Sequence, residues 1–317
     1  MRPRSRREFL AVAGATAAAA AAARHGEGSE TLPRRALGRT GLEVSLLAFG
    51  CGSRFLQYER GDESMAVLER ALALGINYFD TAEQYGNGES ETRLGPFVER
   101  HRASMVLATK VKQEARTRDS ALREVEASLK RLHTDHVDVL HVHSLGDEKD
   151  LAAIMAPDGV LKALLELRAK KVTRAIGITC HNDGRILARA IRENDLDVVQ
   201  IAMNPARSGG LEEHALPAAL EKKLGVLLMK VTGQEKLLGD GASFASPSEL
   251  LRYALSLPIS AAVVGMPRVA HLEGNVAVAR GFAPMTAAEM EALRTRLLPH
   301  RAPLGAFFAT HVDSHTA

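Results

Sequence analysis

The sequence contains no tryptophan, and aromatic residues make up only 4% of its 317 residues. This scarcity argues against an aromatic platform for nucleic-acid bases or sugar rings. Two cysteines, Cys51 and Cys180, are too few to form a disulfide framework. The apolar fraction of 46% and the charged fraction of 25% are ordinary for a globular protein. Function must therefore be sought in particular polar residues rather than in an unusual composition.

The chain has almost no excess charge outside its N-terminus. The formal net charge is +3 at pH 7, and residues 1–23, which hold four arginines and one glutamate, account for all of it. The neutral remainder gives no case for a nucleic-acid partner. The run of small apolar residues Ala11–Ala23 is too short and too rich in alanine to be a lasting membrane span.

The N-terminal segment has the order of features of an export signal. Arg6 and Arg7 lie in the stretch Ser5–Leu10, directly before the alanine-rich run Ala11–Ala23. A basic start followed by a weakly apolar stretch of small residues is typical of such signals. The paired arginines resemble a twin-arginine signal, which exports proteins already folded. We expect residues 1–32 to be signal and linker, the twin-arginine machinery to be a partner, and the protein to be periplasmic. The alternative is an alanine-rich amphipathic or disordered tail.

Beyond this segment, strand and helix patterns alternate. Alternating apolar residues around the turn Arg39–Gly41 predict a β-hairpin over 34–46. Short, often β-branched apolar runs then predict eight strands, at 46–50, 77–80, 105–109, 137–142, 173–178, 198–201, 226–229 and 260–264. Helical periodicity predicts helices at 64–74, 89–100, 119–132, 159–169, 183–192, 212–223, 248–255 and 270–279, with a last one at 287–298.

Eight strand–helix units predict a closed (β/α)₈ barrel over residues 33–298, with 299–317 as a loosely attached tail. A doubly wound open sheet is the competing fold. It needs a G-x-G-x-x-G turn after the first strand, and the turn Gly50–Ser53 has no third glycine in register. In a barrel, Cys51 and Cys180 follow opposite strands. Their Cα atoms would then exceed the ~7 Å limit for a disulfide, so we expect two free thiols.

The polar residues at the carboxyl ends of the strands should meet at the mouth of the barrel. They are Asp80, Tyr85, Lys110, His143, Thr179 and Gln200. Four of them suit the reduction of a carbonyl, whose oxygen must receive a proton. Tyr85 can donate it, although an ordinary tyrosine, with a pKa of ~10, is a reluctant acid. An ammonium at Lys110 favours the phenolate, Asp80 supplies the counter-charge, and His143 can orient the substrate oxygen.

Four stretches carry a resemblance to a known family. They are Leu-Gly-Arg-Thr-Gly-Leu at 37–42, Phe-Asp-Thr-Ala-Glu-Gln-Tyr-Gly at 79–86, Ala-Thr-Lys at 108–110 and Asp-Val-Leu-His-Val-His at 138–143. With them, the chain resembles an aldo-keto reductase from about residue 33 to residue 298. The family's catalytic Asp, Tyr, Lys and His fall on Asp80, Tyr85, Lys110 and His143. The resemblance implies an NADPH- or NADH-dependent enzyme that reduces an aldehyde or ketone, with the cofactor bound extended and without a Rossmann motif.

The resemblance also implies a set of cofactor residues: Gly50, Cys51, Thr179, Cys180, Gln200, Met229, Lys230, Gly265, Pro267, Arg268, His271 and Asn275. Gln200 matches the glutamine that holds the nicotinamide amide. Thr179 and Cys180 stand where the family usually has Ser-Asn, so the hydroxyl is kept and one amide contact is lost. Met229 replaces a stacking tyrosine. Arg268 is the remaining cation for a 2′-phosphate, so NADP(H) is expected and NAD(H) stays open.

Two other functions fit parts of the pattern. His141 and His143 point to the same side of one strand, as ligands do in a metal-dependent barrel hydrolase, and Asp80 and His181 could complete the site. That interpretation leaves Tyr85 and the lysine without roles, and we expect His141 instead to be a core imidazole hydrogen-bonded to a neighbour.

The second alternative is a cofactor-binding barrel subunit without turnover, which the departures at Cys180 and Met229 permit. The intact set of four catalytic residues argues against it.

Substrate identity is expected to depend on Phe55, Tyr58 and the loops 145–158 and 207–211.

Overall fold

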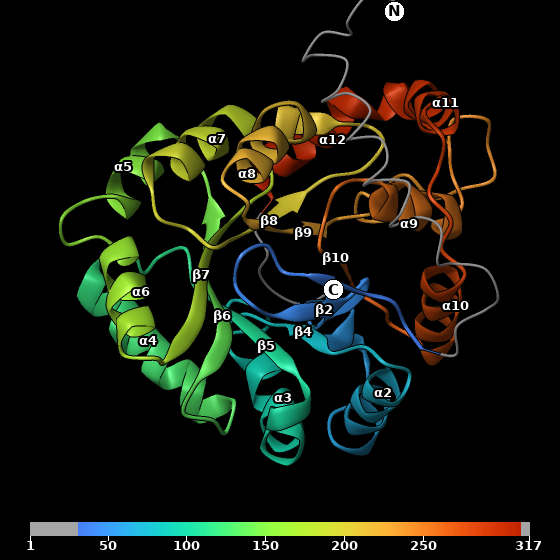
Figure 1. Ribbon diagram of the computed structural model, residues 1–317. Coiled ribbons are helices and arrows are strands. Elements are labelled where there is room, and N and C mark those ends of the chain that lie inside the picture. The colour runs from blue at the N-terminus through green and yellow to red at the C-terminus, as the bar shows by residue number, and fades with distance from the viewer. Residues whose placement is uncertain (1–30, 312–317) are drawn as a thin grey trace, which may run out of the picture.

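Eight short parallel strands close into a barrel in the computed structural model, which describes residues 31–311 (Figure 1). The strands are β3 (Leu47–Gly50), β4 (Tyr78–Asp80), β5 (Val106–Val111), β6 (Val137–Leu145), β7 (Thr173–Cys180), β8 (Val198–Ala202), β9 (Gly225–Met229) and β10 (Ala261–Val264). They pair in chain order, and β10 closes the circle by pairing with both β9 and β3. The strands are apolar on both faces because one face fills the interior and the other packs on helices. The predicted (β/α)₈ barrel is confirmed, and the open sheet is wrong.

The helices surround the barrel as an outer ring in Figure 1. They are α2 (Asp62–Ala73), α3 (Glu89–His101), α4 (Arg118–Arg131), α5 (Glu148–Ile154), α6 (Val160–Ala169), α7 (Gly184–Glu193), α8 (Leu216–Glu221), α9 (Pro247–Ser256), α10 (Val269–Arg280), α11 (Ala287–Leu297) and α12 (Arg301–Thr310). Helix α7 shows why they form: Asp183 caps its first turn by accepting from the N–H of Arg185 and Ile186, and Leu187 and Ile191, four residues apart, face the core. None of the helices in residues 31–311 has the length and apolarity to cross a membrane.

The predicted hairpin is confirmed as β1 (Arg34–Ala36) paired antiparallel with β2 (Glu43–Ser45). Its apolar residues Leu37 and Leu42 join the hydrophobic cluster that fills the barrel interior. Gly38 has a φ of +55°, and a Cβ there would lie 2.1 Å from the nitrogen of Gly225, the first residue of β9. The hairpin therefore lies against the amino end of the barrel and leaves the other end open.

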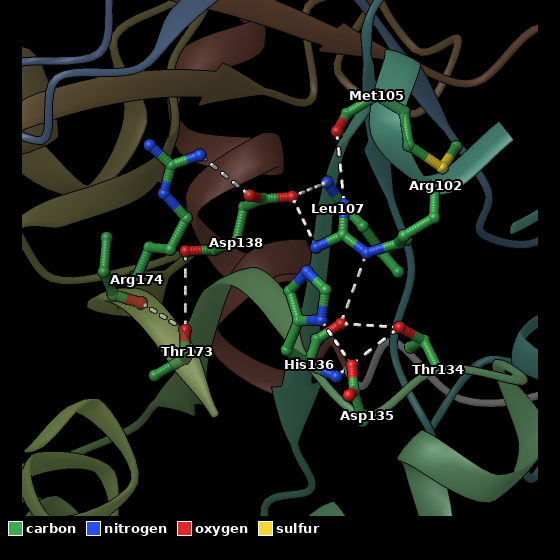
Figure 2. Close-up of polar contacts among 10 residues, drawn as sticks. Arg102, Met105, Leu107, Thr134, Asp135, His136, Asp138, Thr173 and Arg174 are labelled. Atoms are coloured by element: carbon green, nitrogen blue, oxygen red, sulfur yellow. Dashed lines mark hydrogen bonds and ion pairs between the residues drawn. The ribbon is translucent and has the colours of Figure 1, made fainter. Parts of the chain in front are cut away.

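A buried carboxylate ties three strands together at the amino end (Figure 2). Asp138, near the start of β6, accepts a hydrogen bond of 2.9 Å from the N–H of Leu107 on β5. Arg102 lies 2.9 Å from the same carboxylate, and Arg174 on β7 lies 3.4 Å from its other oxygen. These charges neutralise a carboxylate that is only 5% exposed. The cluster lies at the end where barrel residues serve stability rather than catalysis.

The C-terminal segment differs from its prediction. The expectation of a loosely attached tail after residue 298 is wrong for the described part, because residues 301–310 form helix α12. Leu304 and Phe308, four residues apart, are buried against the barrel, and burial of such an apolar pair stabilises the helix by a few kcal/mol. Residue His311 follows it and reaches the mouth. The predicted signal segment, apart from Thr31 and Leu32, and residues 312–317 lie outside the described residues.

Candidate active site

The mouth of the barrel is built around a buried lysine. The Nζ of Lys110 on β5 lies 2.7 Å from Oδ2 of Asp80 at the end of β4, and it donates to the carbonyl of Thr81 at 2.9 Å. Its third contact is Oη of Tyr85 at 3.2 Å. The lysine side chain is 0% exposed and that of Asp80 2% exposed. An isolated buried ammonium would be very costly, and the carboxylate beside Lys110 offsets that cost.

Tyr85 reaches this group from the loop after β4. The ammonium of Lys110 lies 4.8 Å from the centre of the tyrosine ring as well as within hydrogen-bond distance of its oxygen. The ring of His143, on β6, meets the tyrosine ring edge-on at 5.8 Å between centroids and 85°. Because Lys110 donates to the phenol oxygen, the phenol hydrogen is directed away from it. The structure thus brings together the four residues that the sequence predicted as catalytic.

A cavity of about 390 Å³ opens beside these residues. Ten of the sequence-predicted site residues line it: Gly50, Asp80, Tyr85, Gln200, Met229, Lys230, Gly265, Pro267, His271 and Asn275. The other six predicted residues do not: Cys51, Lys110, His143, Thr179, Cys180 and Arg268. The cavity therefore extends from the phenol to the amino end of α10, a span that joins the two ends of the predicted cofactor site.

Gln200 fits the role of holding an amide. Its Nε2 donates to Oδ2 of Asp80 at 3.2 Å and contacts Sδ of Met229 at 3.7 Å. Its Oε1 is buried and has no hydrogen-bond partner among residues 31–311. A buried acceptor without a partner costs about 1–3 kcal/mol. A carboxamide N–H of a nicotinamide would satisfy this oxygen, so the residues present fit a nicotinamide cofactor.

Several basic groups line the remainder of the cavity. Lys230 takes a left-handed backbone conformation, with a φ of +61°, and its Nζ lies 3.1 Å from Nε2 of His311. Arg54, after β3, forms an ion pair of 3.0 Å with Glu235, after β9. A Cβ on Gly265 would lie 2.9 Å from the side chain of Arg54, so glycine permits this close packing. These cations suit an anionic ligand such as a pyrophosphate.

Thr179 and Cys180 are engaged inside the fold. The hydroxyl of Thr179 accepts a hydrogen bond of 2.8 Å from the N–H of Ser144 on the neighbouring strand. The thiol of Cys180 packs against the carbonyls of Leu145 and Asp183 at 3.6 Å. Burial raises the pKa of this thiol to about 11. Both side chains hold β7 to its surroundings rather than lining the cavity.

The two cysteines are free, as predicted, and both are buried. Burial, followed by the charge of Asp80, raises the pKa of the Cys51 thiol well above its ordinary value. A thiol in this state is a poor nucleophile. Cys51 therefore acts as a small buried side chain, with its backbone N–H donating to the carbonyl of Asp80 at 2.8 Å.

His141 on β6 pairs in register with Lys110 on β5, and its hydrogen bonding differs from the prediction. The hydrogen bond to a neighbour was predicted wrongly, because neither ring nitrogen has a partner among the described residues. Burial, then the charges of Lys110 and His143, lowers the pKa of His141 well below its usual value, so the ring is neutral. A Cβ on Gly177 would lie 2.5 Å from Nδ1 of His141, so the imidazole fills the space left by that glycine. Within residues 31–311 no three His, Cys, Asp or Glu side chains could hold a metal ion together.

Some residues of the cavity lining were not predicted from the sequence. His311 and Gln234 line the cavity, and Nε2 of Gln234 lies 3.4 Å from Nε2 of His311. Phe55 and Tyr58, expected in the substrate pocket, instead pack in the core, with Phe55 6.0 Å from the ring of Phe49. The reason is that a short 3₁₀ turn, Phe55–Gln57, turns these aromatic side chains inward. No local sequence pattern predicts such a turn. None predicts that the C-terminal helix returns to the mouth of the barrel.

Comparison with known proteins identifies the family of this chain. The sequence profile of the aldo/keto reductase family matches residues 47–242. Over 227 residues the chain is 32% identical to D-threo-aldose 1-dehydrogenase of a Pseudomonas species, covering 60% of this chain and 67% of that protein. It is 27% identical over 304 residues to the uncharacterized oxidoreductase YqkF of Bacillus subtilis strain 168, covering 83% of this chain and 95% of that one.

Among solved structures, the aldo-keto reductase AKR11C1 of Bacillus halodurans in its holo form superposes with a TM-score of 0.70 at 22% identity. The superposition covers 84% of this chain and 96% of that chain. At this level of identity, the likeness supports the fold alone.

Proposed function

This chain belongs to the aldo/keto reductase family of oxidoreductases, and from that premise we propose that it reduces an aldehyde or ketone to an alcohol with NADPH or NADH. One observation carries the proposal: the ammonium of Lys110 lies 2.7 Å from the Asp80 carboxylate and 3.2 Å from the Tyr85 phenol oxygen. Family members use NAD(P)H, and the bound cofactor supplies the hydride.

The residues at the mouth have complementary tasks in this proposal. Tyr85 gives its proton to the carbonyl oxygen of the substrate, and the Lys110 ammonium stabilises the phenolate that remains. Asp80 neutralises Lys110, so that the buried site carries no uncompensated charge. His143, edge-on to the tyrosine ring, orients the same oxygen by a hydrogen bond. Gln200 would hold the nicotinamide amide through its buried Oε1.

The proposal is tested by single-turnover oxidation of bound NADPH or NADH with a generic aromatic aldehyde. Loss of the reduced-cofactor signal with formation of the alcohol is the expected result. Tight cofactor binding without any oxidation would instead favour the non-catalytic subunit. The reverse reaction, alcohol with the oxidised cofactor, uses the same residues and provides a second measurement.

Cofactor preference is proposed to depend on Arg268, which precedes α10 and is exposed. We expect Arg268→Ala to weaken NADPH binding by about 1.5 kcal/mol, the low end for a hydrogen bond to a charged group, because solvent screens an exposed cation. NADH binding should hardly change. Fluorescence titration with both cofactors measures the difference. An equal loss for both would mean that Arg268 does not contact the 2′-phosphate.

Export through the twin-arginine pathway is likewise a proposal, supported by Arg6, Arg7 and the following alanine-rich run. Replacing both arginines with lysine should keep the protein in the cytoplasm as a longer precursor, because the pair is the recognised part of the signal. Cell fractionation followed by immunoblotting measures the distribution. Undiminished export of the double variant would rule the proposal out.

A further inference from the structure

The end of β6, which carries His143, contains a β-bulge. Val142 pairs with Ile178, but the next pair joins Leu145 to Cys180, so β6 holds one residue more than β7 over this interval. Ser144, inside the bulge, has a φ of +48°, a left-handed conformation that residues other than glycine rarely adopt. Bulges of this kind re-aim a side chain at the rim of a barrel. Here, the residues within the bulge are His143 and Ser144.

The bulge lacks a strand partner on its other side. The ladder between β5 and β6 ends at the pair Val111–Val142, so the carbonyls of His143 and Ser144 lie beyond it. The guanidinium of Arg116, from the loop after β5, takes the place of the missing strand. Its Nη2 donates to the carbonyl of His143 at 2.9 Å and to that of Ser144 at 3.1 Å.

The arginine is itself held rigidly. Asp150 on α5 accepts from its Nε at 2.7 Å and from its Nη2 at 2.9 Å, a bidentate pair with side chains only 12% and 18% exposed. The same carboxylate accepts a bond of 2.9 Å from the N–H of Gly146, just past the bulge. The carbonyl of Arg116 in turn accepts from the N–H of Val160 at the start of α6. Bidentate geometry restrains orientation as well as distance.

We propose that Arg116, held by Asp150, is a positioning residue that keeps the bulge of β6 in place and thereby keeps the imidazole of His143 against Tyr85. Arg116 touches no reacting atom and lies outside the cavity lining. It acts on the backbone of the residue that orients the substrate oxygen. The rate effects below rest on the proposed function, whereas the spectroscopic measurement does not.

The chain provides a matched control two residues away. Arg118 forms a comparable bidentate pair with Glu166, with distances of 2.9 and 2.7 Å, but within residues 31–311 its side chain forms no hydrogen bond or ion pair with β6. Arg118→Ala should therefore remove a comparable but more exposed ion pair, with side chains 35% and 29% exposed, without disturbing the bulge. Any effect that Arg116→Ala has beyond this control reports on β6.

The test that is independent of turnover is a ¹H–¹⁵N spectrum of the histidine rings in the full chain, with the His143 signals assigned from their loss in His143→Gln. We expect Arg116→Ala to shift or broaden the His143 signals, while Arg118→Ala leaves them in place. If Arg116→Ala does not fold, Asp150→Asn, which weakens the hold on the guanidinium, serves for the same comparison. Unchanged His143 signals in a folded variant would overturn the proposal, whether or not the protein is an active reductase.

The kinetic test uses single-turnover oxidation of bound NADPH. Arg116→Ala should lower the rate about 10- to 100-fold, the cost of a displacement on the order of 1 Å at a reacting centre, with cofactor affinity unchanged. Added to His143→Ala, the same substitution should change the rate less than about twofold, because its effect passes through that imidazole. An equal rate loss in both backgrounds would overturn the proposal. An inactive wild type with the spectral shifts present would mean instead that the proposed function has failed.

Discussion

Tyr85→Phe is expected to reduce the rate of carbonyl reduction by a factor of about 10²–10⁴, the usual worth of a positioned acid. The substitution removes only the hydroxyl, whose oxygen lies 3.2 Å from Nζ of Lys110. The ring and its edge-on contact with His143 remain, so the barrel should keep its stability. Single-turnover oxidation of bound NADPH with an aromatic aldehyde measures the effect.

The chain offers a control for this experiment. Tyr58 is buried in the core and does not line the cavity. Tyr58→Phe should therefore leave the hydride-transfer rate unchanged, and both variants should bind the cofactor as the wild type does. A near-normal rate in Tyr85→Phe, with a substrate that the wild type reduces, would show that Tyr85 is not the proton donor.

Lys110→Met is expected to reduce the rate by about 10²-fold, because the phenolate of Tyr85 loses the ammonium that stabilises it. It should also destabilise the fold by about 3–5 kcal/mol, the cost of leaving the partner of a buried ion pair uncompensated. The partner is Asp80, whose side chain is 2% exposed. Urea unfolding and single-turnover kinetics, performed on the same preparation, separate the two effects.

Lys112 is the matched control for this substitution. It lies two residues further along the same segment and pairs with Glu124 at 3.0 Å and Glu83 at 3.5 Å, with its side chain 29% exposed. Lys112→Met should affect stability by less than about 1 kcal/mol and leave the rate unchanged.

Combining Tyr85→Phe with Lys110→Met should be little worse than either change alone, because groups that act as a unit are not additive. Fully multiplicative losses would mean that the two residues act independently.

The proposed twin-arginine route would link export to catalysis. A cofactor that is held tightly can cross with a protein that folds before export, which suits a nucleotide-dependent enzyme. The span of the cavity, from Tyr85 to Asn275 on α10, is consistent with an extended nucleotide held along its length. Arg54 and Glu235, on two loops that both line the cavity, form an ion pair of 3.0 Å.

Parts of the site could be predicted from the sequence because their signals are local. A polar residue at the end of an apolar strand must lie at the mouth of a parallel barrel, which brings Asp80 and Lys110 together from neighbouring strands. Tyr85 follows in the next loop, within reach of both. The alternation of strand and helix patterns likewise specified the closed barrel, since no Gly-rich turn supported an open sheet.

Other parts depended on contacts between residues far apart in the chain. The neutral state of His141 follows from complete burial beside Lys110, and Thr179 satisfies a backbone N–H of the bulge instead of lining the cavity. Neither follows from residue type. His311 reaches Lys230 over 81 residues of sequence, because burial of Leu304 and Phe308 directs the C-terminal helix back to the mouth.

The sequence by itself determined the barrel, its hairpin and the identity of the four residues at the mouth, since hydrophobic period and strand-end position are properties of short segments. Only the tertiary structure decided how His143 is aimed. Its strand carries an extra residue, and the strain of that bulge is held by Arg116 and Asp150, which lie 34 positions apart. An orientation of this kind is set by a guanidinium that donates to two backbone carbonyls and is itself held by a carboxylate. No periodic sequence pattern predicts that these groups will meet.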